Sequence, residues 1–176
     1  MKEIDTNNWK SFQIKNIFTI KRPPERKQSL YEEGHIPFIA SGCFNNGVQV
    51  YLEPKANELL DKGNCITISP VDGYAFYQKN DFLGRGGAGS SIILLYNENL
   101  NENNGRFVAT VIRYVFSNWT YSNMGNKDIV KDEWIKLPVD ANGTPDWQYM
   151  EDYMKGLEAR AQKTLDCFVD CTSLQQ

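Results

Sequence analysis

The residues Gly84-Arg-Gly-Gly-Ala-Gly89 follow the G-x-G-x-x-G spacing with which glycines bring a backbone close to a phosphate. In a dinucleotide-binding protein this motif leads into a helix, but here it continues as Ser-Ser-Ile-Ile-Leu-Leu95, which favours a strand. We therefore interpret the segment as a glycine-rich loop that carries Arg85. Its guanidinium can form two parallel hydrogen bonds with guanine or pair with a phosphate. The alternative is a mobile hairpin tip without a ligand.

Catalytic side chains do not occur in the combinations that familiar reactions need. An adenine methyltransferase would hold its flipped base with an Asp/Asn-Pro-Pro-aromatic run, whereas Arg22-Pro-Pro-Glu25 has the wrong residues on both sides. Pro145-Asp146 lacks the spaced acid and lysine with which a metal-dependent nuclease binds its cation. The single histidine, His35, has no nucleophile to serve, and the four cysteines show no C-x-x-C spacing. We predict no enzyme, no metal and no cofactor.

Two polar segments have the composition of a DNA surface. A basic loop supplies Lys21, Arg22, Arg26 and Lys27 with nothing apolar to bury, so these four are expected to contact phosphates. The second segment, Tyr121-Ser-Asn-Met-Gly-Asn-Lys127, combines an aromatic ring, amides, a glycine and a lysine. Amides recognise base edges in the major groove, while a lysine fixes the register on phosphates. For both segments a solvated loop is the alternative.

Short apolar runs between turn residues predict the elements that position these loops. Strands are expected at residues 35–40, 48–52, 65–69, 74–78, 91–96 and 134–138. A buried helix is predicted over 106–116, although its β-branched residues also suit a strand. In residues 9–20 helix and strand remain alternatives, and the Pro23-Pro24 pair ends either. The body is therefore expected to be a mixed α/β domain that is rich in strands, that is, a β-rich α+β fold.

A C-terminal amphipathic helix is predicted after this body. Asn142-Gly143 favours a tight turn, Thr144 is expected to cap the helix and Pro145 to occupy its first position. Apolar residues then alternate at spacings of three and four, as in a coiled coil. They are Trp147, Met150, Met154, Leu157, Ala161, Thr164, Phe168 and Cys171. The stripe is expected to contact a partner helix, the alternative being its own domain. The expected domains are 1–143 and 144–176.

Charge divides the chain in the same way. The net charge is −3, but residues 140–176 hold seven acids against three bases, whereas residues 1–139 hold sixteen bases against fifteen acids. The body is thus near neutral and the helix acidic. No apolar run is long enough for a signal peptide or a membrane span. With reduced thiols expected, we predict a soluble cytoplasmic protein.

Taken in order, loose motifs along most of the chain resemble one family. They are Trp9…Phe12-x-Ile14-x-x-Ile17-Phe18-x-Ile20, Ile36-Pro-Phe-Ile-Ala-Ser-Gly42 with Asn45-Asn-Gly47, Asn64-Cys-Ile-Thr-Ile68 with Gly73-x-x-Phe76-Tyr-Gln78, Phe107-x-x-Thr110, Tyr121-x-x-x-Gly125-x-Lys127, Ile135-x-Leu-Pro-Val139 and Gly143-x-Pro-Asp-Trp-x-x-Met-Glu151. The sequence resembles a target recognition domain of the specificity subunit of type I restriction-modification systems, and is similar to type IIB specificity subunits.

The resemblance implies a non-catalytic domain that recognises one half of a split double-stranded DNA site. It implies partners too: long helices bind adenine methyltransferase subunits, and the complex includes a restriction subunit. The DNA contacts expected from matching loops are Ser41, Asn45, Asn46, Arg85, Tyr121, Asn123 and Lys127. A full subunit has two such domains and two long helices. This chain is therefore expected to be either a half-subunit that forms a homodimer through the helix stripe or a fragment.

A different class of function is also open. The near-neutral body suits a relative that keeps the fold, lacks DNA binding and pairs with a specificity subunit through the acidic helix. Salt dependence separates the two hypotheses, because phosphate contacts make DNA affinity fall with salt.

Overall fold

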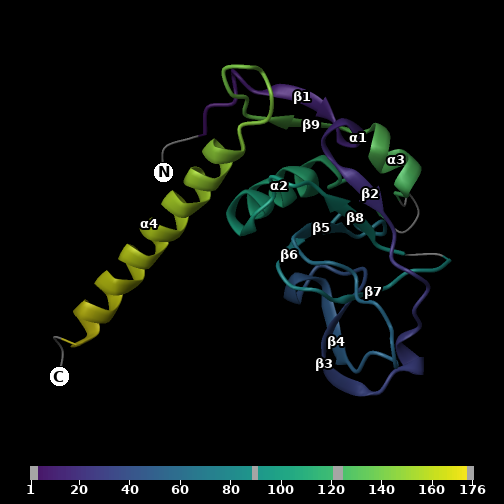
Figure 1. Ribbon diagram of the computed structural model, residues 1–176. Coiled ribbons are helices and arrows are strands. Elements are labelled where there is room, and N and C mark those ends of the chain that lie inside the picture. The colour runs from purple at the N-terminus through teal and green to yellow at the C-terminus, as the bar shows by residue number, and fades with distance from the viewer. Residues whose placement is uncertain (1–3, 89–90, 121–124, 174–176) are drawn as a thin grey trace.

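The structure, a computed structural model, describes residues 4–88, 91–120 and 125–173, with side chains described as far as Cys167 (Figure 1). Its strands form three small sheets. The first pairs β1 (Lys10–Gln13) with β9 (Trp134–Leu137). The second has the order β2 (Thr19–Lys21), β8 (Ile93–Tyr96), β5 (Cys65–Ile68), β6 (Ala75–Gln78). The third has the order β4 (Val48–Leu52), β3 (Glu33–Ile39), β7 (Leu83–Gly84).

Four α-helices and two 3-10 turns complete the described part of the chain. They are α1 (Ile14–Ile17), α2 (Glu102–Val115), α3 (Lys127–Asp132), α4 (Trp147–Ser173), η1 (Gln28–Leu30) and η2 (Asn45–Gly47). The mixed, β-rich α/β class predicted from the sequence is confirmed. Figure 1 shows α4 on the opposite side of the body from α3 and β2.

The main core lies between α2 and the four-stranded sheet. Val108 and Ile112 are fully buried there, together with Ile66 and Ile68 of β5. The helix begins before the predicted 106–116 because Asn101 caps it: its side chain accepts hydrogen bonds from the amides of Asn103 and Asn104 at 3.0 and 3.1 Å. The capping residue satisfies amides that a helix start leaves unpaired, so the helix extends into the polar stretch.

Residues 9–20, for which helix and strand were alternatives, contain both kinds of element. β1 pairs antiparallel with β9, α1 adds one turn, and β2 joins the four-stranded sheet beside β8. Ile14 and Phe18 are buried in the main core. The Ile14 amide also donates to the Glu133 carbonyl at 2.9 Å, which ties α1 to the end of α3.

The start of α4 differs from the prediction. Asp146 is its cap, since the Asp146 carboxylate accepts from the amide of Tyr149 at 2.8 Å. Thr144 instead donates its hydroxyl to Asp140 at 2.9 Å, and Pro145 lies outside the helix in a β-bridge with Val139. The carboxylate also lies at the positive end of the helix dipole.

The first half of α4 packs on its own domain. Met150 is 0% exposed in the main core, and Trp147 and Met154 pack against that core. The Tyr153 ring meets Phe107 of α2 edge-on, with ring centroids 5.6 Å apart. The prediction that Met150 contacts a partner helix is therefore wrong. Met150 packs on its own domain, which was the alternative.

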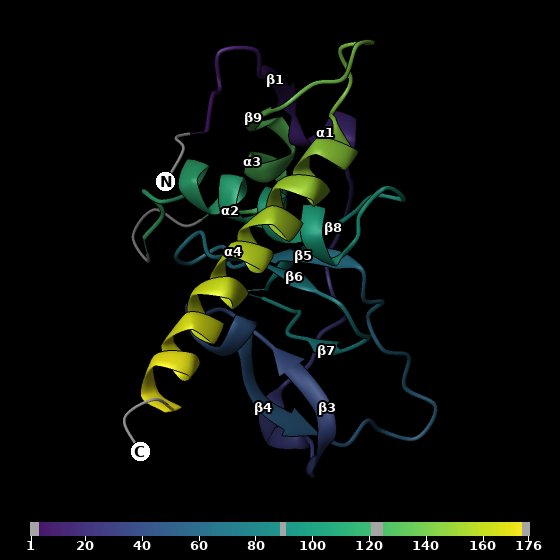
Figure 2. The same ribbon diagram turned by 90° about the vertical axis from the view of Figure 1, so that its left-hand side faces the viewer.

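The second half of α4 is not buried against the domain. Side chains from Glu158 to Cys167 are all exposed, including Ala161, Thr164 and Leu165, and Figure 2 shows this part of the helix continuing beyond α2. Leu157 is half-buried at the transition, while the side chains of Phe168 and Cys171 lie outside the described residues. None of the helices in the described ranges is both long and apolar enough to span a membrane.

Candidate nucleic-acid interface

A pair of parallel strands brings two of the predicted DNA loops together. Phe38 of β3 pairs with Leu83 of β7, and Ile39 pairs with Gly84. Parallel strands end at the same edge, so the loop after β3 and the loop after β7 leave the sheet side by side. The Arg85 amide donates to the Ile39 carbonyl at 2.8 Å, which joins the two loops at their bases.

The loop at 41–47 is held by its own polar side chains. Asn46 donates from its amide to the Tyr77 carbonyl at 3.1 Å and to the side chain of Gln78 at 3.0 Å, and Gln78 donates back to the Asn46 carbonyl at 2.9 Å. Gln49 donates to the Ser41 carbonyl at 2.7 Å. Asn45 and Asn46 both have positive φ, a conformation that asparagine tolerates better than most residues. The side-chain amide nitrogen of Asn46 is therefore already used in hydrogen bonds to β6.

This held loop presents an aromatic side chain that sequence reasoning missed. Phe44 is 83% exposed between the polar turn residues. An apolar residue inside an otherwise polar turn was the available signal. Phenylalanine in such a place suits contact with a thymine methyl group.

Gly84, Gly86 and Gly87 allow their loop to pack closely on a neighbouring segment. A Cβ on Gly86 would lie 2.1 Å from the Pro24 carbonyl oxygen, and one on Gly84 would lie 2.7 Å from the Pro23 ring. Gly87 has φ of +93°. The loop thus packs closely on residues 23–25, and the strand predicted after it is present as β8. Arg85 is half-buried, and Gly89 lies outside the described residues.

Arg26 is not available to phosphates, so its prediction as a phosphate contact is wrong. Its side chain is buried and donates from Nε to Glu58 Oε1 and from Nη1 to Asp61 Oδ2, both at 2.6 Å. Burial acts to lower the pKa of Arg26, but the hydrogen bond to Glu58 and the charge of Asp61 raise it above its ordinary value. The guanidinium is therefore a structural cation inside the protein.

The two carboxylates around Arg26 shift in opposite directions. Burial raises the pKa of Asp61 above its ordinary value, against the opposing hydrogen bond from the Gly84 amide and the charge of Arg26. Burial also acts to raise the pKa of Glu58, but the hydrogen bonds from Arg26, the Lys55 amide and Tyr31 lower it overall. The more accessible Glu58 is the one held firmly in its charged form.

The other basic residues of that loop remain at the surface. Lys21, Arg22 and Lys27 are exposed. Lys21 pairs with Leu94 at the beginning of β8, and its ammonium lies 5.3 Å from the ring centre of Tyr96. Lys27 lies 3.8 Å from the Glu25 carboxylate. Lys21 thus lies beside the strand into which the glycine-rich loop leads, and Lys27 lines a hollow next to that loop.

The third predicted segment is only partly described. Tyr121 and Asn123 lie outside the described residues. Lys127 is exposed as the first residue of α3, and the Gly125 amide donates to the Pro70 carbonyl at 2.8 Å. Because Ile68 of β5 pairs with Ile93 of β8, this contact places Gly125 near the sheet end where the glycine-rich loop enters β8.

The predicted contacts therefore spread over strands of two sheets rather than meeting at a point. Asn46 lies at β6, while Lys21 belongs to β2, the opposite edge strand of the four-stranded sheet. Four strands spaced about 4.8 Å apart span roughly 14 Å. A duplex rises about 3.4 Å per base pair, so this width corresponds to about four base pairs.

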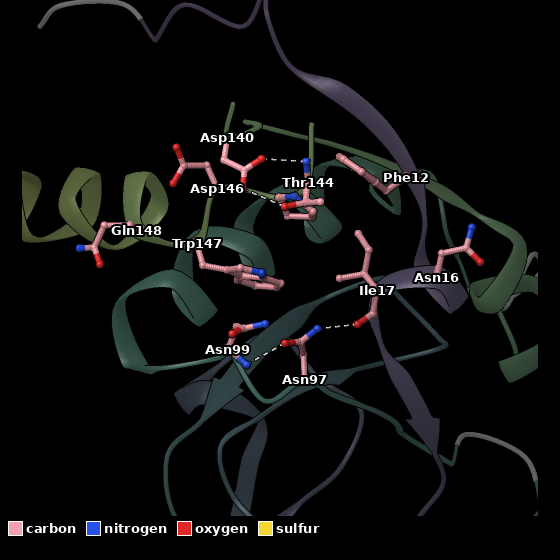
Figure 3. A pocket seen from close by; sticks show the side chains of 11 residues that line it. Phe12, Asn16, Ile17, Asn97, Asn99, Asp140, Thr144, Asp146, Trp147 and Gln148 are labelled. Atoms are coloured by element: carbon pink, nitrogen blue, oxygen red, sulfur yellow. Dashed lines mark hydrogen bonds between the residues drawn. The ribbon is translucent and has the colours of Figure 1, made fainter. Parts of the chain in front are cut away.

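Hollows in the described surface lie beside these loops and elsewhere. One of about 610 Å³ lies between residues 25–29 and the loop of Arg85. Another of about 640 Å³ lies where α4 begins, with Phe12, Ile17 and Trp147 among its lining residues (Figure 3). There Asn97 donates to the Ile17 carbonyl at 2.6 Å. The hollow at α4 is separate from the loops that are predicted to contact DNA.

Comparisons with known proteins identify the family of the chain. Residues 6–166 match the family described as type I restriction modification DNA specificity domain. The specificity subunit S.BcgI, of a type II restriction enzyme from Heyndrickxia coagulans, is 28% identical over 158 residues, which are 86% of this chain and 44% of that subunit.

Solved structures show the same fold at low sequence identity. The HsdS subunit from Thermoanaerobacter tengcongensis matches with a TM-score of 0.56 at 15% identity, over 92% of this chain and 40% of that one. The type I restriction-modification S subunit from M. genitalium matches with a TM-score of 0.55 at 15% identity, over 94% of this chain and 44% of that one. The chain spans less than half the length of these relatives. Since the family match covers most of its residues, the chain belongs to the family of type I restriction modification DNA specificity domains.

Proposed function

We propose that this chain recognises a short double-stranded DNA sequence, one half of a split site, for a cytoplasmic restriction-modification system. The observation that carries the proposal is the parallel pairing of β3 with β7. It places the loop of Ser41 and Asn45 beside the loop of Arg85. Lys27 lines the hollow beside the Arg85 loop, and the neighbouring loop carries the neutral amides of Asn45 and Asn46. Cations on phosphates and amides on base edges are the usual division of contacts.

Within this proposal the predicted contacts keep their roles, except for Arg26. Base edges are contacted from the loops that carry Ser41, Asn45, Asn46, Arg85, Tyr121 and Asn123, and Lys127 contacts a phosphate. Lys21, Arg22 and Lys27 contact phosphates. The chain supplies recognition, and the chemistry belongs to other subunits.

The exposed half of α4 is the proposed docking element for those subunits. Its side chains are uncovered from Glu158 to Cys167, and Leu165 is 59% exposed. We propose that it binds an adenine methyltransferase subunit, or a second copy of this chain that supplies the other half-site, with a restriction subunit joining the assembly. In this arrangement residues 1–143 form the recognition domain and 144–176 the spacer helix.

The test is selection of bound duplexes from a randomised DNA pool at two salt concentrations, after the size of the protein in solution has been measured. An enriched half-site of a few base pairs, with affinity falling linearly as log salt rises, supports the proposal. Enrichment duplicated at a fixed spacing supports a dimer. No enrichment at either salt, both alone and with a methyltransferase subunit, contradicts DNA recognition.

The second candidate is a protein-interaction relative without DNA binding, which the uncovered distal half of the net acidic helix α4 favours. This candidate function predicts tight binding to a specificity or methyltransferase subunit. It also predicts no DNA binding at any salt concentration, so there is no affinity that falls as salt rises. The same salt series, with and without that subunit, separates the two functions.

A further inference from the structure

Arg26 joins three chain segments inside the body. Besides its contacts with Glu58 and Asp61, its Nη2 donates to the Leu59 carbonyl at 2.9 Å and its Nη1 donates to the Gly84 carbonyl at 3.0 Å. A buried guanidinium is costly unless its donors are satisfied, and here every nitrogen has a partner. The residues it binds come from the segment after β4 and from β7.

Both backbone polar groups of Gly84 form hydrogen bonds to side chains. Asp61 Oδ2 accepts from the Gly84 amide at 2.9 Å, while Arg26 donates to the Gly84 carbonyl. The same Asp61 oxygen also accepts from Arg26 at 2.6 Å. The Arg26–Asp61 pair therefore brackets Gly84: Asp61 holds the peptide plane before it, and Arg26 holds the plane between Gly84 and Arg85.

The backbone of Arg85 is fixed from its other side as well. Its amide donates to the Ile39 carbonyl at 2.8 Å, and its carbonyl accepts from the Ile92 amide at 3.1 Å. With the peptide planes on both sides of Gly84 held by Arg26 and Asp61, the direction in which the Arg85 side chain leaves the backbone is determined. Holding a recognition side chain in advance lowers the entropy lost when it binds.

We infer that Arg26 is a positioning residue that sets base preference at the position contacted by Arg85, without itself contacting DNA. This inference rests on the proposed function and deepens it. A lysine at position 26 keeps the charge but lacks the planar fork needed to bind two carboxylates and the Gly84 carbonyl together.

The first test needs no DNA. We expect Arg26→Lys to raise amide hydrogen exchange of residues 84–88 about tenfold or more, with exchange in β5 unchanged. Glu58→Gln is the matched control: it removes one charge from the same cluster but leaves both contacts to Gly84 in place. Equal exchange of 84–88 in the wild type and a folded Arg26→Lys variant would overturn the inference.

The second test uses the randomised duplex pool. Arg26→Lys should relax preference about tenfold at the single base pair that Arg85→Ala also relaxes, and should have no further effect in the Arg85→Ala background. Glu58→Gln should leave that preference unchanged. Uniform weakening at every position with a flatter salt dependence would instead mean direct phosphate contact and would overturn the inference.

A further variant guards against loss of folding. Arg26→Met combined with Asp61→Leu and Glu58→Gln removes the buried cation together with the charges of both carboxylates, a change that buried ion clusters often tolerate. It should fold, as measured by thermal unfolding, and show the same faster exchange of residues 84–88. If the wild type bound no DNA, the proposed function would fail, while hydrogen exchange would still show whether Arg26 and Asp61 hold Gly84.

Discussion

Arg85 lies where β3 and β7 end together, so its side chain tests the DNA proposal most directly. Arg85→Ala should cost on the order of 1–3 kcal/mol of binding free energy and relax preference at one base pair. The check is a comparison of affinities for the selected half-site and its single-base variants. Lys163→Ala, which removes an exposed cation from α4, is the matched control and should bind as the wild type does.

Lys127 should behave differently, because a lysine on phosphate carries no sequence information. Lys127→Ala is expected to weaken all duplexes alike and to reduce the slope of log affinity against log salt by about one. Titrations at several salt concentrations measure this slope. Wild-type binding by both Lys127→Ala and Arg85→Ala would place the DNA site elsewhere on the molecule.

Cys65 provides a prediction that does not depend on DNA. It is fully buried in β5, and burial raises the pKa of its thiol to about 12. Only the thiolate reacts with alkylating agents, so Cys65 should stay unmodified at pH 8 while the exposed Cys167 is alkylated. Peptide mapping by mass spectrometry checks this, with the unfolded protein as control. Equal rates at both cysteines in the folded protein would contradict the packing of β5.

Single residues also show where sequence reasoning reaches its limit. Arg26 and Lys27 are neighbours in one basic loop, yet one is buried and the other exposed. The difference depends on Glu58 and Asp61, which are 32 and 35 residues away from Arg26 along the chain. No local sequence pattern indicates that these carboxylates contact the basic loop. The burial of Arg26 could therefore be recognised only from the tertiary structure.

At the scale of elements, α4 contains two kinds of surface. Met150 is 0% exposed, so Met150→Ala should lower the free energy of unfolding by roughly 2–5 kcal/mol. Leu165 is 59% exposed, and Leu165→Ala should change it by less than about 0.5 kcal/mol. Denaturant unfolding of the two variants provides the comparison. A large loss from Leu165→Ala at low protein concentration would show that the distal half of α4 also packs on the body.

Elements with a clear local pattern were predictable from the sequence. β4 has the predicted bounds 48–52, because its apolar alternation ends in turn residues on both sides. α2 was predicted from its apolar face, but its start depended on the Asn101 cap within a polar stretch. For α4 the helix itself was predictable, whereas the cap was not, because Thr144 and Asp146 are both good capping residues. Which of them caps is decided by the Asp140 side chain that binds Thr144.

For the whole molecule, the distribution of charge gives a preferred direction of approach. The acidic helix α4 lies on the opposite side of the body from α3 and β2, which carry Lys127 and Lys21 (Figure 1). The net negative charge of α4 repels a polyanion such as DNA, so DNA is expected to approach the side that carries Lys127 and Lys21. Composition alone could not show that these lysines and the acidic helix lie on opposite sides of the body.

The pairing of β1 with β9 also has a consequence for how the protein is made. These strands stand near the two ends of the body sequence, so a chain emerging from the ribosome cannot complete that sheet until Trp134–Leu137 has been synthesised. Contacts between distant parts of a chain form slowly. Until they form, Ile14 lacks the hydrogen bond with which the Glu133 carbonyl holds α1. A chain released before these strands are made should thus remain incompletely folded. We expect proteases to degrade it before it can bind DNA.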